Sequence, residues 1–378
     1  MKITLLVLLI CTLSSKAYSS GIYTNYDLDT TVFDIGEPLN LWINFLKTED
    51  DSLGAKYWNK AELEKYSDSA YFLAENELQF GSDNFLKLLT YTNIKILSVR
   101  QVGEYHKITS IIEFDQMEEG ESNIQYILHV YAGLDEGELK LFNALGVNTK
   151  LNLNSSQVGF IKFHYPKYHE FNYDLANKLN DFVIDFSENF DVPLDTIDYY
   201  FAPTNEEIQR IKGFDFLIGD NGKGIPSGKA DADNRIVYST GLGEYYPHEI
   251  IHILINPYFP NCHLWLNEGL ATYFGMSRGK ELDWHLRKVN LHLQNNPDIN
   301  LSNMLDYMTI DQYTNFKYAL GGYIIGKVFE KGGYQELKGI LKSGKTDEEF
   351  YGTISKYLGV KRENLNEYIR NELKTRFE

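Results

Sequence analysis

The alternation of hydrophobic and polar residues divides the chain into two parts with different patterns. In the first part, stretches of alternating apolar and polar residues predict β-strands, separated by short turns that contain Gly. The predicted strands cover residues 94–99, 105–114, 124–131 and 138–145. Before them, apolar residues spaced along a charged background over residues 58–80 predict a helix. One helix followed by an antiparallel sheet indicates an α+β module.

The pattern changes near Gly159 and becomes almost wholly helical after residue 246. Strands are predicted at residues 160–165, 197–202 and 234–239, a helix at 174–190, and a Gly-rich loop at 219–228. Further helices are predicted at residues 246–254, 264–274, 281–294, 311–331, 334–342, 347–358 and 362–376. We therefore expect an α+β protein with an N-terminal module over residues 18–158 and a second domain over 159–378. In its order of elements the N-terminal module loosely resembles the cystatin or nuclear transport factor two-like cone.

Residues 1–17 have the pattern of a signal peptide. Lys2 precedes an apolar run, and small or polar residues follow around Ala17. The run is too short to cross a bilayer unaided, and no later segment reaches about 18 uninterrupted apolar residues. Cleavage near Ala17 is preferred over lipid attachment at Cys11, because Ile10 stands where a lipoprotein signal has a small residue. The mature protein is therefore expected to be secreted or periplasmic, without a transmembrane span.

The composition is that of a folded protein that does not bind nucleic acid. With 378 residues, 43% hydrophobic and 24% charged, the chain is long enough for two or three domains with cores of their own. A formal net charge of -17 argues against nucleic acid, because binding phosphates requires a basic surface. The sequence around Lys223 lacks the phosphate-binding pattern G-x-x-x-x-G-K-[ST], so turn chemistry explains its glycines better.

An H-E-x-x-H motif formed by His248, Glu249 and His252 is the strongest chemical signal in the sequence. On a helix this spacing places both imidazoles on one face, where each can bind the same tetrahedral ion at about 2.0 to 2.1 Å. A loop with two prolines and the start of another helix follow, which can bring Glu268 back beside the histidines. Two His and one Glu leave the fourth position of a zinc ion open, as in catalytic rather than structural sites.

The H-E-x-x-H motif followed by the N-E-G-x-A sequence around Glu268 resembles the gluzincin metallopeptidases, typified by thermolysin and the aminopeptidase N group. Within them, the match over about residues 234–333 resembles a bacterial aminopeptidase-like branch. The resemblance implies a thermolysin-like domain with a small sheet and a mostly helical C-terminal half. It also implies one zinc ion per chain bound by His248, His252 and Glu268, and hydrolysis of peptide bonds by a zinc-activated water with Glu249 as general base.

The resemblance further implies a tyrosine that stabilises the oxyanion. In the family this residue often precedes a Gly by three positions at the start of a long helix, a form that Tyr318 and Gly321 fit. Tyr313 and Tyr323 lie close by in the sequence, and with 28 Tyr in the chain simple packing is a competing interpretation. Tyr318 is therefore the preferred choice among three.

Other residues near the motif are candidates for orienting the imidazoles. Thr272 follows Glu268 by one helical turn and so lies on the same face, and Asn267 is the alternative. His263, a single histidine beside a turn, is interpreted as a surface residue.

One departure from the family concerns how the substrate is recognised. The Gly-x-Met-Glu-Asn motif with which aminopeptidases bind a free substrate amine is missing, so aminopeptidase specificity does not follow from the resemblance. The corresponding stretch, residues 234–239, is expected to be an edge strand that pairs with extended peptide backbone. A peptide or protein substrate is expected.

Two other functions compete with peptide hydrolysis. One is a catalytically silent, secreted zinc-binding or interaction protein on the same scaffold, but a substitution at Glu249 would be its mark and none is present. The other is zinc-dependent hydrolysis of a non-peptide bond, which no residue specifically supports.

Overall fold

The computed structural model describes residues 21–31, 34–48, 54–66, 92–115, 122–218 and 224–378. The predicted signal peptide and residues 67–80 of the first predicted helix lie outside these residues. Contacts divide the chain into two compact units. Unit 1 consists of Met1–Asn143 and Phe214–Ile218, and unit 2 of Ala144–Gly213 and Gly219–Glu378. The predicted domains 18–158 and 159–378 stay predictions.

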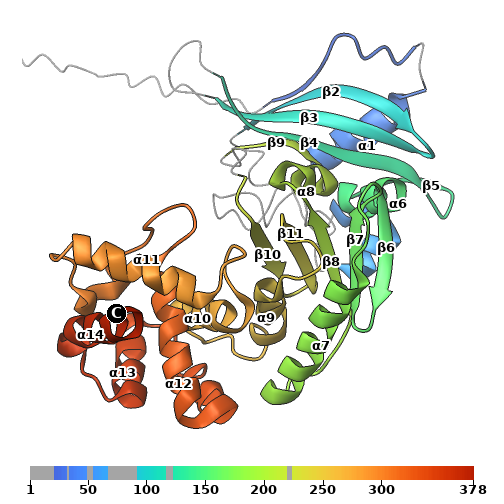
Figure 1. The fold of residues 1–378 in the computed structure, drawn as a ribbon. Coiled ribbons are helices and arrows are strands. Elements are labelled where there is room, and N and C mark those ends of the chain that lie inside the picture. The colour runs from blue at the N-terminus through green and yellow to red at the C-terminus, as the bar shows by residue number, and fades with distance from the viewer. Residues whose placement is uncertain (1–20, 32–33, 49–53, 67–91, 116–121, 219–223) are drawn as a thin grey trace, which may run out of the picture. The chain divides into compact units, whose positions relative to one another are not determined.

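Unit 1 contains a mostly antiparallel sheet. Its strands in sheet order are β1 (Ile22–Thr24), β2 (Thr92–Val102), β3 (Tyr105–Asp115), β4 (Ser122–Asp135) and β5 (Glu138–Phe142), and β9 (Phe214–Leu217) also pairs with β4. The four strands predicted from alternation are confirmed as β2 to β5 (Figure 1). The last of them ends at Phe142, before the predicted residue 145, because a helix begins at Ala144.

Among the described residues of unit 1, three short helices accompany this sheet. They are α1 (Gly36–Leu46), the 3-10 helix η1 (Ala55–Tyr57) and α3 (Lys60–Lys65). The sequence pattern did not predict α1, yet its buried Trp42 and Phe45 belong to the same core cluster as Ile108 and Val130 of the sheet. The indole Nε1 of Trp42 donates a hydrogen bond to Ser110 Oγ at 3.0 Å, which satisfies the buried polar atom.

Unit 2 is built on a second, five-stranded sheet. Its strands in sheet order are β10 (Ser227–Asp231), β11 (Ile236–Thr240), β8 (Ile197–Ala202), β7 (Ile161–Pro166) and β6 (Leu153–Val158). The inner strands β11, β8 and β7 run parallel and match the three predicted strands, whereas β6 and β10 are antiparallel to their neighbours. The two outer strands were not predicted. Both are rich in small or polar residues, and β10 begins within the stretch expected to be a loop.

Helices form most of the remainder of unit 2 (Figure 1). Those before the motif are α6 (Ala144–Asn152), α7 (Tyr173–Phe190) and α8 (Asn205–Lys212). From the motif onward they are α9 (Pro247–Ile255), α10 (Leu264–Gly275), α11 (Leu282–Asn295), η2 (Leu301–Asp306), α12 (Phe316–Ile340), α13 (Asp347–Leu358), η3 (Arg362–Asn364) and α14 (Leu365–Phe377).

Most helices predicted for this unit are confirmed within a few residues. Element α12 contains the two helices predicted at residues 311–331 and 334–342. The first begins later, at Phe316, and Gly332 and Gly333, whose backbone angles are not helical, separate it from the second. Gly333 has a φ of 60°, a backbone conformation that glycine adopts without steric cost. The glycine pair therefore separates the two helices, as the sequence predicts.

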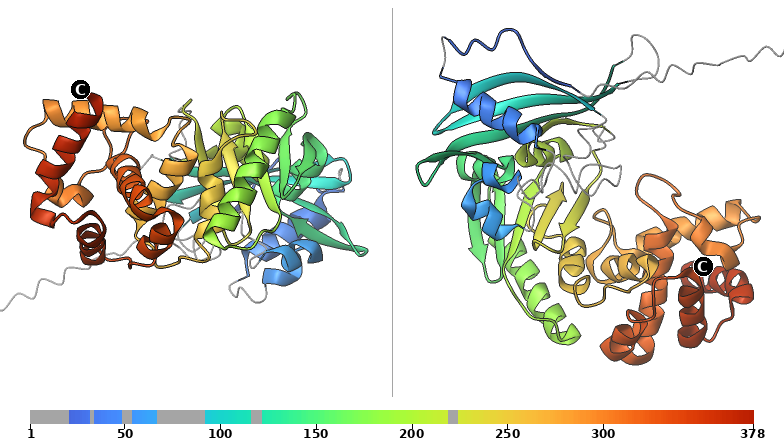
Figure 2. Two further views of the ribbon diagram at one scale, coloured as in Figure 1. Left: turned by 60° about the horizontal axis from the view of Figure 1, so that its bottom comes forward. Right: turned by 180° about the vertical axis from the view of Figure 1, so that it is seen from behind.

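The packing of α10 against α12 determines where the site residues lie. A Cβ atom added to Gly269 would lie 2.3 Å from the backbone carbon of Gly321, so the two helices touch backbone to backbone. Helix α9 packs against β10, β11 and α10, and Figure 2 shows α10 between the sheet and the C-terminal helices. Within the described residues, no helix has the length and apolar character needed to cross a membrane.

Candidate metal centre

Helix α9 carries the H-E-x-x-H motif through the core of unit 2. Pro247 occupies the first helical position, where its missing N–H costs nothing because that donor would have no partner within the helix. Every residue of α9 is buried. His248 and His252 lie one turn apart with ring centroids separated by 5.1 Å, so both imidazoles face the same side.

Helix α10 returns along α9 and brings Glu268 to the two histidines. The N-cap of α10 is His263, whose Nδ1 accepts a hydrogen bond from the Trp265 backbone N–H at 3.2 Å. His263 is buried, so its interpretation as a surface residue is wrong. At the other end of α10, a Cβ on Gly275 would lie 2.5 Å from the backbone nitrogen of His248, so the helix passes very close to the motif.

Three potential ligand atoms converge between these helices. Glu268 Oε2 lies 3.4 Å from Nε2 of His248 and 3.5 Å from Nε2 of His252. Ligands at 2.0 to 2.1 Å from a tetrahedral zinc ion are about 3.4 Å apart, so these separations fit such an ion. Within the part of the chain that the structure describes, this is the one group of three or more His, Cys, Asp or Glu residues that could hold a metal.

Both imidazoles are oriented by acceptors at their other nitrogen. His248 Nδ1 lies 2.6 Å from the backbone oxygen of Met276, and His252 Nδ1 lies 3.3 Å from Oδ1 of Asn267. Because these oxygens accept the Nδ1 proton, the Nε2 lone pairs remain available to a metal. The hydroxyl of Thr272 instead donates to the backbone oxygen of Glu268, so Asn267 is the side chain that orients an imidazole.

Burial and neighbouring charges shift the ionisation of the metal-free site. Burial raises the pKa of Glu249, and the charges of His248 and His252 oppose this rise only in part. Burial also acts to raise the pKa of Glu268, but hydrogen bonds to the two histidines outweigh it and hold that pKa well below its usual range. One carboxylate is therefore a better proton acceptor than an ordinary glutamate, and the other stays ionised.

The three candidate tyrosines lie in different places. The ring of Tyr318 lies beside that of His248, with centroids 6.0 Å apart. Tyr313 instead packs edge-on against Trp284, and Tyr323 donates a hydrogen bond to Glu372. Burial, followed by the charge of Glu268, raises the pKa of Tyr318, so its phenol stays a hydrogen-bond donor at neutral pH.

Two further residues of the candidate site were not predicted from the sequence. Lys317 Nζ lies 3.2 Å from Oε1 of Glu268. Tyr246 precedes the motif helix, and its ring stacks on His248 with centroids 5.7 Å apart and an interplanar angle of 11°. Neither belongs to a recognisable motif. The adjacency of Lys317 to Tyr318 is the one signal that could have drawn attention to it.

The strand beside the motif differs from the one expected. Strand β11 pairs with neighbours on both sides, so the expectation of an edge strand at residues 234–239 is wrong. Among the described residues, β10 is the edge of this sheet on the side of the motif. A Cβ added to Gly228 of β10 would lie 2.5 Å from Glu249 Cγ and 2.7 Å from Tyr246 Cε1. The edge strand therefore touches the site directly.

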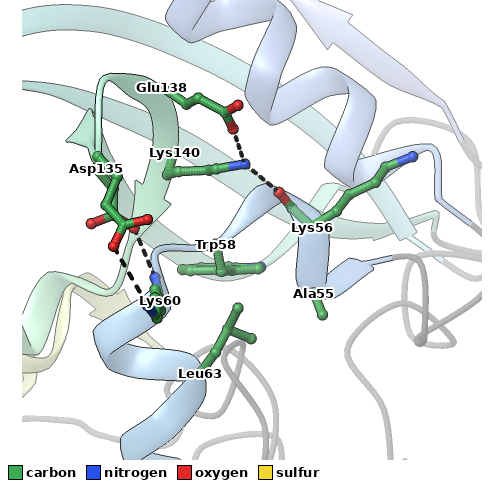
Figure 3. A pocket seen from close by; sticks show the side chains of 9 residues that line it. Ala55, Lys56, Trp58, Lys60, Leu63, Asp135, Glu138 and Lys140 are labelled. Atoms are coloured by element: carbon green, nitrogen blue, oxygen red, sulfur yellow. Dashed lines mark hydrogen bonds and ion pairs between the residues drawn. The ribbon is translucent and has the colours of Figure 1, made fainter.

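Unit 1 contains a separate hollow of about 340 Å³ beside Trp58. Figure 3 shows the ammonium group of Lys140 turned toward the carboxylate of Glu138, and the carboxylate of Asp135 turned toward Lys60. Lys140 Nζ donates to the backbone oxygen of Lys56 at 3.0 Å and pairs with Glu138 at 2.9 Å. The backbone N–H of Lys60 donates to a carboxylate oxygen of Asp135. Because these groups are already paired, the cluster in unit 2 is the stronger candidate site.

Comparison with known proteins adds little to this picture. No protein-family model and no curated protein matches the chain. Among solved structures, it is similar to an M1 zinc metallopeptidase from Deinococcus radiodurans, with 12% identity, a TM-score of 0.31, and coverage of 75% of this chain and 62% of that chain. A mutant of an M1 zinc metallopeptidase from the same organism gives 13% identity, a TM-score of 0.31, and coverage of 76% and 63%. The chain thus spans less than two thirds of the length of these structures.

Proposed function

We propose that this protein is a secreted zinc metallopeptidase of the gluzincin type. The observation that carries the proposal is the convergence of Nε2 of His248, Nε2 of His252 and Oε2 of Glu268, with separations of 3.4 and 3.5 Å that fit one tetrahedral zinc ion. These donors leave a fourth position open. The signal-peptide pattern of residues 1–17 supports export.

In this proposal the zinc ion, when bound, polarises the attacking water and the substrate carbonyl. Glu249 accepts the proton of that water and returns it to the leaving amine. The phenol of Tyr318 donates a hydrogen bond to the oxyanion that develops on the carbonyl.

The substrate class follows from the edge strand. Among the described residues β10 is the outermost strand of its sheet, and an extended peptide could add to such a strand through main-chain hydrogen bonds, a mode that tolerates many sequences. Because Gly228 of this strand lies against Glu249, such a peptide would pass beside the general base. We therefore propose a peptide or protein substrate.

Substitution of the general base tests this function. Glu249→Gln keeps the size of the side chain but cannot accept the proton, so we expect unchanged zinc content and a loss of about 10²–10⁴ in kcat. Chelator-sensitive cleavage of a peptide library measures the loss, and mass spectrometry measures the zinc. Glu330→Gln, a side chain 61% exposed on α12, is the matched control. Full activity in Glu249→Gln would rule out the mechanism.

A further inference from the structure

The two carboxylate oxygens of Glu268 lie in different environments. Oε2 faces the Nε2 atoms of His248 and His252, whereas Oε1 accepts a hydrogen bond from Lys317 Nζ at 3.2 Å. The side chains of Lys317 and Glu268 are only 14% and 16% exposed. Water and salt screen such a pair much less than a surface ion pair. The ammonium group therefore holds one oxygen of the carboxylate and leaves the other to face the imidazoles.

Lys317 occupies a helix position that does not favour a cation. Helix α12 begins at Phe316 after the N-cap Asn315, whose side chain accepts a hydrogen bond from the Lys317 backbone N–H at 2.8 Å. The N-terminus of a helix carries a partial positive charge, so a cation in its first turn is unfavourable by about 0.3–1 kcal/mol. The contact with Glu268 offsets this cost. Residues that depart from a local preference, as Lys317 does in the first turn of this helix, are expected at functional sites.

We propose that Lys317 is a positioning residue that restricts Glu268 to binding the metal through a single oxygen. A carboxylate with both oxygens free can bind a cation through either one or two of them. When the ammonium group holds Oε1, only Oε2 remains for the metal. Together with His248 and His252 this gives three donor atoms and keeps the remaining zinc position open. Side chains that hydrogen-bond to a metal ligand are known to tune the affinity of the site for its metal.

This inference rests on the metal-binding part of the proposed function, and it does not depend on peptide hydrolysis. Lys317 Nζ also lies 5.0 Å from the ring centroid of the neighbouring Tyr318. A substitution at Lys317 can therefore disturb the oxyanion donor as well as the metal ligand. For this reason the test measures the metal itself and does not rely on activity.

Three variants of the full-length mature protein test the role of Lys317. Lys317→Met removes the charge while keeping a long, helix-compatible side chain, and Lys317→Arg keeps the charge. Lys327→Met is the matched control, because Lys327 lies on the same helix and pairs with Glu372, which is not one of the site residues, at 2.6 Å. Zinc affinity is measured by competition with a chelator of known affinity. The visible absorption of the Co²⁺-loaded protein, which weakens as coordination rises above four, reports the number of ligands.

We expect zinc to bind Lys317→Met about 10–100-fold more weakly than the wild type, with a weakened Co²⁺ absorption. Lys317→Arg should recover most of the affinity, and Lys327→Met should match the wild type. Equal affinity and an unchanged Co²⁺ spectrum in Lys317→Met would overturn the inference. If that variant does not fold, Lys317→Gln, which is shorter and uncharged, is judged by the same criteria.

The outcomes also separate this inference from peptidase activity. If the wild type binds zinc but cleaves no peptide, and Lys317→Met still binds zinc more weakly, the positioning role stands and the peptidase proposal fails. If the wild type binds zinc and cleaves peptides while Lys317→Met keeps full zinc affinity, the peptidase proposal stands and the positioning role of Lys317 fails. A wild type that binds no zinc would contradict both.

Discussion

At the scale of single residues, the candidate site combines a buried carboxyl group, that of Glu249, with a half-buried phenol, that of Tyr318, near the histidines. Glu249 is 7% exposed and belongs to the motif helix, whereas Tyr318 comes from α12, far along the chain. The H-E-x-x-H motif predicted the two histidines and Glu249, and the later N-E-G-x-A sequence predicted Glu268. Lys317 could not be found in this way, because its contact with Glu268 exists only when two distant helices meet. The Met276 carbonyl that accepts a hydrogen bond from His248 could not be predicted either, because every residue has a backbone carbonyl and the sequence does not distinguish this one.

Removing the hydroxyl of Tyr318 tests its role as oxyanion donor. Tyr318→Phe keeps the ring that lies beside His248, so we expect unchanged zinc content and a fall in kcat of about 10²–10³. Steady-state kinetics with a peptide substrate measure the fall. Tyr323→Phe is the control, because its hydroxyl binds Glu372 and should be dispensable for catalysis. A Tyr318→Phe enzyme as fast as the wild type would exclude this role.

At the scale of elements, the site depends on how closely α10 and α12 approach. Gly269 and Gly321 meet at their crossing, next in sequence to Glu268 and close to Tyr318. The sequence predicted both helices from their periodicity but not this contact. It also missed β10, because a strand of small and polar residues next to a Gly-rich stretch looks like a loop. Pairing with β11, which the sequence pattern does not encode locally, makes these residues a strand.

Adding a methyl group at the helix crossing should disturb the site. A Cβ at Gly321 would lie 2.2 Å from the backbone oxygen of Trp265, so Gly321→Ala must push α12 away from α10. We expect a loss of about 1–3 kcal/mol in the free energy of unfolding, together with weaker zinc binding. Denaturant unfolding and chelator competition measure the two effects. Gly352→Ala on α13 is the control, because its Cβ would meet nothing within 4 Å. If Gly321→Ala and Gly352→Ala changed the free energy of unfolding and the zinc affinity equally, the close crossing of α10 and α12 would not be what positions the site.

At the scale of the whole molecule, all proposed zinc ligands belong to unit 2. The sequence distinguished a strand-rich first part from a helix-rich second part, because hydrophobic residues recur with a different period in strands than in helices. It could not reveal that β9 of the later sequence joins the sheet of unit 1, since strand pairing over such a distance leaves no local pattern.

Zinc should therefore stabilise the two units unequally. A ligand that binds only the folded state at a thousand times its Kd adds about 4.1 kcal/mol to the free energy of unfolding. We expect zinc to increase amide protection in α9, α10 and the start of α12, and to leave β2 to β5 unchanged. Hydrogen–deuterium exchange with zinc and with chelator measures this. An equal zinc-dependent increase in amide protection in both sheets, or no increase in α9, would contradict the assignment of the zinc ligands to unit 2.

The most direct test of the central claim is the metal content of the purified mature protein, measured by mass spectrometry together with cleavage of a peptide library. The wild type should hold about one zinc ion per chain and cleave peptides until a chelator is added. The His248→Ala/His252→Ala double variant should lose both the zinc and the cleavage. A wild type without zinc, or a double variant that keeps it, would contradict the account of this site.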